Sequence, residues 1–151
     1  PQLPQLIALA DALPDLEIIL DHVGTPDLRG RYAGREDEAM AEWREAIAGL
    51  AERPNVRVKL SGMGMDVTGR MLAHTGPAAS KELAARWKPL VEHCISAFTP
   101  QRCVFASNFP PDRNAASYGT VWNAFKRIAH GYSHAERTWL FHDTAAETYR
   151  F

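Results

Sequence analysis

CVFASNFPPD, residues 103–112, begins as an apolar run and ends in a polar turn that contains two prolines. Two earlier stretches share this form: LEIILDHVG, residues 16–24, and VRVKLSGMGM, residues 56–65. Short runs rich in Val, Ile, Leu or Phe that end in polar or glycine-bearing turns are typical of buried parallel strands. The three stretches therefore predict three strands of one parallel sheet.

Amphipathic helical patterns separate these strands. Apolar residues recur at spacings of three and four over residues 36–53 and again over residues 80–98, which places them on one face of each helix. We expect Ser80 to be the N-cap of the second helix and Pro89 to kink or split it. The chain also opens in a helical pattern, so strands and helices alternate, which is typical of right-handed βαβ units.

The last segment of the chain is predicted to be helical. An apolar face spans residues 118–128, and Ser133 and Glu136 fit a capping box that opens a short helix over residues 135–141. Thr144 could cap one further turn through Tyr149. A sheet of three parallel strands is thin, with two unpaired edges, so we expect one incomplete α/β domain over residues 1–151, whose strands belong to a larger sheet.

Composition excludes several classes of protein. The 151 residues carry a net charge of -1 and are 46% hydrophobic, so we expect a compact core and no nucleic-acid or membrane partner. No apolar run is long enough to span a bilayer. Cys94 and Cys103 each lie in an apolar run and are expected to be buried and unpaired. No charged and apolar leader opens the chain, so a cytoplasmic location is expected.

Candidate functional residues follow the predicted strands, because ligands bind at the carboxyl ends of parallel strands. The three ends supply Asp21 and His22, Lys59 and Ser61, and Asn108 with Asp112. His22 can ligate a metal or polarise a carbonyl group. Asp112 can take a proton from water, whereas the amide of Asn108 can orient water but cannot act as a base.

Each candidate also has a structural interpretation. His22 could serve only as a hydrogen-bonding residue at a strand end, and Lys59 could pair with a carboxylate. Ser61 could belong to a simple turn with Gly62, Asn108 to an Asx turn, and Asp112 could cap or solvate its loop.

The loop over residues 66–79 lacks clear periodicity. Long loops after barrel strands often bind substrate, so its His74 is a further, weaker candidate.

Four segments in this order resemble the closing half of the amidohydrolase-related barrel hydrolases, a family that includes sugar-lactone and pyrone-dicarboxylate lactonases. They are IILDHVGTP, NVRVKLSGMGM, RCVFASNFPPDR and LFHDTAAETYRF. The resemblance covers essentially the whole chain. It implies a (β/α)₈ TIM barrel of roughly twice this length, of which this chain would hold the sixth, seventh and eighth strands with their helices.

The resemblance also implies roles for particular residues. His22 matches the sixth-strand histidine, which binds metal or polarises the substrate carbonyl group. Asn108 lies where most relatives carry the aspartate that activates water, so Asp112 or Asp21 would have to supply the base. Lys59 and Ser61 match residues of the site wall. A divalent metal, zinc or manganese, is implied, although the His-x-His of the family's first strand does not occur in this chain.

The sequence therefore predicts a hydrolase that acts on a lactone or a related ester or amide through attack of an activated water. The alternative is a small α/β module, a decayed or truncated barrel, that binds a ligand without turnover. We expect a small-molecule substrate. The isolated chain is expected to be inactive and either to self-associate or to need the missing amino-terminal barrel half.

Overall fold

The computed structural model describes residues 2–26, 28, 30–65 and 78–151. Its centre is a three-stranded parallel sheet in the order β1-β2-β3. The strands are β1 (Ile18–Leu20), β2 (Val56–Leu60) and β3 (Cys103–Phe105). Each strand lies inside one of the three apolar stretches, so the predicted parallel sheet is confirmed, with strands shorter than the stretches themselves.

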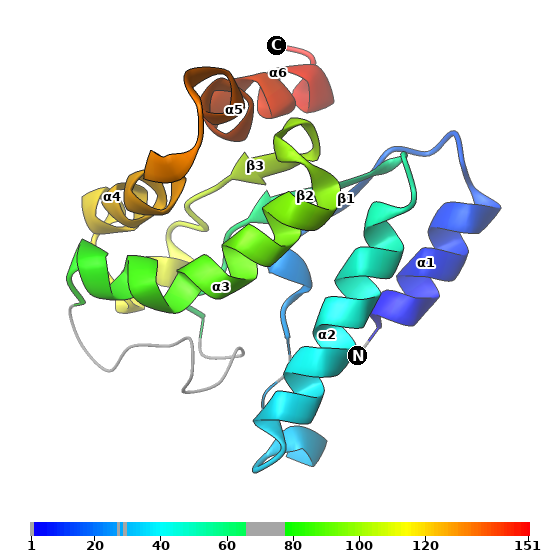
Figure 1. Cartoon of the computed structure of the whole chain (residues 1–151), viewed down its shortest axis with the longest axis horizontal. Helices are drawn as coiled ribbons and strands as arrows, with labels where there is room; N and C mark the ends of the chain where they lie inside the picture. Colours follow the sequence, from blue (N-terminus) through cyan, green and yellow to red (C-terminus); the bar gives the residue numbers. More distant parts are fainter. Residues whose placement is uncertain (1, 27, 29, 66–77) are drawn as a thin grey trace.

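Helices cover the sheet in a row. Figure 1 shows α2 and α3 side by side against the sheet, α1 beside α2, α4 beside α3, and α5 and α6 past β3. The bounds are α1 (Leu3–Ala12), α2 (Glu36–Ala51), α3 (Ser80–Phe98), α4 (Tyr118–Ile128), α5 (His134–Thr138) and α6 (Thr144–Tyr149). The predicted alternation of helices and strands is therefore confirmed.

Strand β2 shows why one face of the sheet forms the core. Val56, Val58 and Leu60 are fully buried, whereas Arg57 and Lys59 between them are only partly buried. This alternation turns the apolar side chains toward the helices and the two cations toward the opposite face. The helices complete the core with side chains that are almost fully buried: Ile47, Leu50, Leu83, Trp87, Val91 and Phe125.

Two local predictions about helix ends are wrong, and the helix predicted to be kinked or split at Pro89 is not split. Helix α3 begins at Ser80 with Ala79 as its N-cap, because the Glu82 carboxylate accepts the Ala79 N–H at 3.0 Å. Pro89 lies inside α3 without splitting it, since α3 packs into the core on both sides of the proline. Thr144 does not cap a separate turn. It continues a π-helical turn, Trp139–Asp143, directly into α6.

Other predictions about the chain are confirmed. Ser133 and Glu136 form a capping box at the start of α5. Cys94 and Cys103 are both free and fully buried, and this burial raises the pKa of each thiol. Among the described residues, no helix has the length and apolar character needed to cross a membrane.

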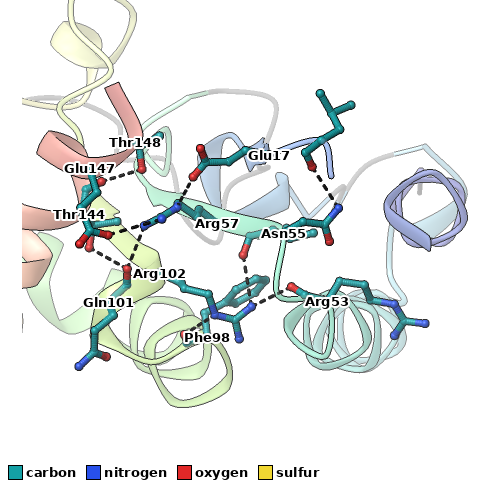
Figure 2. Close-up of polar contacts among 12 residues, drawn as sticks. Glu17, Arg53, Asn55, Arg57, Phe98, Gln101, Arg102, Thr144, Glu147 and Thr148 are labelled. Atoms are coloured by element: carbon teal, nitrogen blue, oxygen red, sulfur yellow. Dashed lines mark hydrogen bonds and ion pairs between the residues drawn. The ribbon is translucent and has the colours of Figure 1, made fainter. Parts of the chain in front are cut away.

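A polar network closes the amino-terminal end of the sheet, where the strands begin (Figure 2). The Arg102 guanidinium donates hydrogen bonds to four backbone carbonyls, which belong to Ala51, Arg53, Val56 and Phe98. Two of these carbonyls lie at the last residues of α2 and α3, where helices leave acceptors unpaired. Arg102 therefore ties both helix ends to the start of β2.

Candidate functional site

The end of β1 is a tight turn with unusual backbone geometry. His22 and Val23 have φ values of 56° and 49°, in the left-handed region that costs a non-glycine residue roughly 1–2 kcal/mol. Two features of Val23 stabilise this strained conformation. The Val23 side chain is fully buried, and the Trp43 indole Nε1 donates to the Val23 carbonyl at 2.8 Å. Helix α2 thus fixes the backbone that presents His22.

The His22 imidazole reaches from the end of β1 to the end of β2. Its Nδ1 lies 2.8 Å from the hydroxyl oxygen of Ser61, a side chain that is only 1% exposed. Gly62 makes this approach possible, because a Cβ atom there would lie 2.5 Å from the His22 Cγ. Gly62 also has a φ of 70°, which glycine adopts without strain.

Asp112 is the buried acid of the third strand end, at 1% exposure. Its Oδ1 accepts a hydrogen bond from the Asn108 amide at 2.8 Å, and its Oδ2 accepts the backbone N–H of Gly64 at 3.4 Å. Burial raises the pKa of Asp112, while these two hydrogen bonds and the nearby charge of His22 partly lower it again. The interpretation of Asp112 as a solvated loop residue is therefore wrong.

Asn108 lies in a turn that its backbone carbonyl closes, whereas the predicted Asx turn would need a bond from its side chain to its own backbone. It has a φ of 52°, and its carbonyl accepts the N–H of Asp112 at 3.0 Å. Its side-chain amide donates to the Asp112 carboxylate as well. Asn108 therefore fixes both the backbone and the side chain of Asp112.

Lys59 and Asp21 form a second link between β1 and β2. The Lys59 ammonium lies 3.0 Å from the Asp21 carboxylate and 5.5 Å from the centre of the Tyr149 ring. The hydroxyl of Tyr149, followed by Asp21, holds the pKa of Lys59 above its usual value. Pairing with a carboxylate, one interpretation of Lys59, is thus confirmed; its role in binding substrate stays a prediction.

The structure therefore places the predicted residues as two bridges and one buried acid at the same edge of the sheet. His22 with Ser61 and Asp21 with Lys59 bridge β1 to β2, and Asp112 with Asn108 follows β3. His22 and Asp112 are close enough to interact electrostatically. His74 and most of its loop, residues 66–77, lie outside the described residues.

Two glycines of this edge were missed as site residues. The sequence GMG, residues 62–64, indicates only a turn, yet each glycine makes room for one functional side chain. A Cβ atom at Gly64 would lie 2.8 Å from that of Ala115 and 3.1 Å from the Asp112 Cγ. The signal was the position of both glycines directly after a predicted strand, where a backbone often approaches another group closely.

The residues present do not make up a complete metal centre. Within the described part of the chain, no three His, Cys, Asp or Glu side chains gather closely enough to hold a metal ion. His22 has one nitrogen beyond the one that faces Ser61, and Asp112 has two oxygens that already accept hydrogen bonds. A metal would need further ligands from outside these residues.

Comparison with known proteins places this geometry in a family. The family profile described as amidohydrolase matches residues 1–151. The chain belongs to the amidohydrolase family. The protein y4mH of Sinorhizobium fredii is 40% identical over 150 residues, which cover 99% of this chain and 44% of that protein. The L-fucono-1,5-lactonase of Burkholderia multivorans is 35% identical over 153 residues, covering 98% of this chain and 48% of the lactonase.

Solved structures agree with this assignment. An amidohydrolase from Burkholderia multivorans with bound HEPES superposes with a TM-score of 0.82 at 34% identity, covering 99% of this chain and 50% of the other. A zinc-bound structure of an amidohydrolase from the same organism gives 0.81 at 33% identity, covering 99% and 49%. This amidohydrolase chain thus spans about half the length of its relatives, and its sheet corresponds to part of their TIM barrel, as the resemblance implied.

Proposed function

We propose that the protein hydrolyses a lactone, or a related ester or amide, at the carboxyl edge of its sheet. The observation that carries the proposal is that a partly buried imidazole, His22 after β1, and a buried carboxylate, Asp112 after β3, lie at the same edge of the sheet on either side of the end of β2. Membership of the amidohydrolase family supports hydrolysis as the reaction class. The names of the lactonase relatives support a sugar lactone as the substrate class.

His22 and Asp112 have different roles in this reaction. His22 donates a hydrogen bond to the carbonyl oxygen, which makes the carbon more electrophilic. Asp112 takes a proton from the attacking water, and the raised pKa of its carboxylate makes it a stronger base than an exposed aspartate. The water oxygen bonds to the carbonyl carbon, the ring C–O bond breaks, and the proton passes to the leaving oxygen to give a hydroxy acid.

The other candidates shape the site around this pair. Asn108, which cannot act as a base, orients the Asp112 carboxylate through its amide. Lys59 and Asp21 bind polar groups of the substrate beside His22. The opposite wall comes from outside this half-barrel, either from the rest of a longer chain or from a second copy. If zinc or manganese takes part, the remaining ligands also come from there.

The test is hydrolysis of a panel of sugar lactones by the natural full-length protein, with and without a chelator. We expect turnover, and a fall in kcat of at least about 100-fold in both His22→Ala and Asp112→Asn, in keeping with the loss of an acid–base group. His142→Ala and Asp143→Asn are matched controls, because they alter an exposed His–Asp pair far along the chain. Equal activity of His22→Ala and the parent would overturn the role of His22.

A second function, ligand binding without turnover, is favoured by one observation. Asn108 stands where the family resemblance implies a catalytic aspartate, so the chemistry of the site could have been lost. The same lactone panel separates the two proposals: binding measured by calorimetry with no hydroxy acid released would favour the binding module.

A further inference from the structure

The buried Ser61 hydroxyl is in direct contact with the His22 imidazole. Ser61 is 1% exposed, so it is shielded from solvent. Among the described residues, the group that its hydroxyl contacts within hydrogen-bond distance is the His22 Nδ1, at 2.8 Å. The hydrogen bond between these two side chains therefore determines which imidazole nitrogen carries the ring proton of His22.

A buried hydroxyl needs an acceptor for its proton, because an unsatisfied buried donor costs the full desolvation penalty of the group. In the described structure the Nδ1 lone pair supplies that acceptor. A neutral imidazole carries one N–H and one bare nitrogen. If Nδ1 accepts from Ser61, the ring proton must lie on Nε2.

The ring has little freedom to escape this contact. Gly62 packs so closely under it that a Cβ atom would lie 2.6 Å from the His22 Cβ and from Nδ1. The backbone of the turn is held from the other side by the hydrogen bond from Trp43 to the Val23 carbonyl. His22 is thus fixed with Nδ1 on Ser61 and Nε2 on the other side of the ring.

We infer that Ser61 is a positioning residue that holds neutral His22 in its Nε2–H tautomer. The catalytic half of this inference rests on the proposed function: in that tautomer His22 donates a hydrogen bond to the substrate carbonyl. Ligation of a metal through Nε2 would need the opposite tautomer, which would leave the Ser61 proton without its acceptor. Ser61 acts through His22 and does not touch the substrate.

The tautomer can be measured without any assay of activity. The natural full-length protein is labelled with ¹⁵N-histidine, and two-bond ¹H–¹⁵N correlations, whose patterns differ between the two neutral tautomers, are recorded near pH 8. The His22 signals are assigned by their loss in His22→Gln. We expect the Nε2–H pattern in the parent and a mixture of tautomers in Ser61→Ala. Thr144→Val is the matched control, since it removes another fully buried hydroxyl, one that bonds the Pro100 and Gln101 carbonyls.

Each outcome decides the inference. An Nδ1–H pattern in the parent, or an unchanged pattern in a folded Ser61→Ala, would overturn it. If Ser61→Ala does not fold, the pattern of the parent alone decides. Kinetics then tests the catalytic half: we expect kcat for the lactone to fall about tenfold in Ser61→Ala with little change in KM, as for other residues that orient a functional histidine. A parent that hydrolyses no lactone would refute the proposed function and leave the tautomer result standing.

Discussion

The two ends of the three-stranded sheet satisfy their polar groups in different ways. Where the strands begin, one cation, Arg102, donates to four main-chain carbonyls, as Figure 2 shows in part. Where the strands finish, side chains pair with side chains: His22 with Ser61, and Asn108 with Asp112. The first arrangement joins elements of the backbone, whereas the second holds titratable groups at fixed positions.

Backbone conformation shows the same difference. Of the six non-glycine residues with positive φ in the described part of the chain, four lie where strands finish: His22, Val23, Thr25 and Asn108. Strained residues persist only where the surrounding structure over-determines them, and they cluster at functional sites. The sheet is therefore cross-linked through backbone groups where its strands begin, and it holds strained residues and buried polar side chains where they finish.

Loss of Arg102 should have the largest effect on stability. Arg102→Ala removes the side-chain donor that four carbonyls share and a cation that lies 5.1 Å from the Phe98 ring centre. We expect the free energy of unfolding to fall by about 3 kcal/mol, because a hydrogen bond to a charged group contributes roughly 1.5–3 kcal/mol net and water can replace part of the lost donors at these partly buried carbonyls. Urea unfolding measures this change.

The matched control is Arg35→Ala, which removes an exposed arginine that pairs with Glu38 three positions along the chain and should change stability by less than about 0.5 kcal/mol. If the comparison of the two ends is right, folded Arg102→Ala keeps its kcat for the lactone. A large loss of kcat with little loss of stability would contradict the inference that Arg102 contributes to stability and not to activity.

A methyl group at Gly62 should disrupt the carboxyl end of the sheet, where His22 lies. In Gly62→Ala the new Cβ atom meets the His22 ring at 2.5 Å, and the backbone keeps a φ of 70° that alanine disfavours. We expect a loss of about 2 kcal/mol of stability and a fall in kcat of roughly 100-fold as the imidazole is displaced.

Gly34→Ala is the control that separates the effect of backbone strain from the effect of displacing the His22 ring. Gly34 has a φ of 78°, but apart from its chain neighbours no atom of the described residues lies within 4 Å of its would-be Cβ, so the variant suffers the backbone strain alone, about 1 kcal/mol. Its activity should match that of the parent. Equal effects of the two variants on kcat would show that the close approach of His22 to Gly62 does not matter for function.

The sheet and the residues at its carboxyl edge could be predicted because they follow from local pattern and one general rule. Three apolar runs between amphipathic segments predicted the parallel strands, and the rule that ligands meet strand ends placed His22, Ser61 and Asp112 at one edge. Each of these predictions needs only residues near in sequence.

What the sequence could not predict depends on contacts between distant segments. Arg102 bonds carbonyls about fifty positions earlier in the chain, and nothing in the sequence around it specifies those partners. Asp112 follows two prolines in a polar stretch that is typical of a solvated loop. It is buried because the short 3₁₀ turn Pro111–Asn114 brings its carboxylate against Gly64. Of the kink or split predicted at Pro89, the split does not occur, because tertiary packing along α3 outweighs the one lost backbone donor.

The buried Asp112 should make stability depend on pH. Because its pKa is raised on folding, the folded protein keeps this proton to higher pH than the unfolded chain does. The stabilising contribution is therefore fully present below the ordinary carboxyl pKa of about 4 and is lost as the pH rises through the folded value, at about 1.4 kcal/mol per unit of pKa shift. In Asp112→Asn the side chain cannot ionise, so the variant should not lose stability in this way as the pH rises.

We therefore expect the stability of Asp112→Asn to improve relative to the parent as the pH rises above the ordinary carboxyl pKa of about 4. Urea unfolding at several pH values measures the difference. Asp143→Asn, which alters an aspartate at a more exposed ion pair, serves as the control. Parallel pH profiles for the parent and Asp112→Asn would show that burial does not shift this carboxyl group.

The smallest expected effects come from two ion pairs that join β2 to the segment around β1, one toward each end of the sheet. Arg57 pairs with Glu17 where the strands begin, and Lys59 pairs with Asp21 where they finish. Glu17 and Asp21 are both exposed, with 41% and 58% of their side-chain surface accessible. Glu17→Gln and Asp21→Asn should each lower stability by no more than about 0.5 kcal/mol.

Activity should distinguish these two variants where stability does not. Asp21 directly precedes His22, so we expect Asp21→Asn to raise KM for the lactone about fivefold, a loss of roughly 1 kcal/mol in binding, and Glu17→Gln to leave it unchanged. The effect should stay small because Tyr149 continues to hold Lys59 when Asp21 is neutral. If Asp21→Asn matches the parent, the Lys59–Asp21 pair is purely structural, and the functional part of this edge narrows to His22, Ser61 and Asp112. If Glu17→Gln raises KM as much as Asp21→Asn does, the two ends of the sheet are coupled.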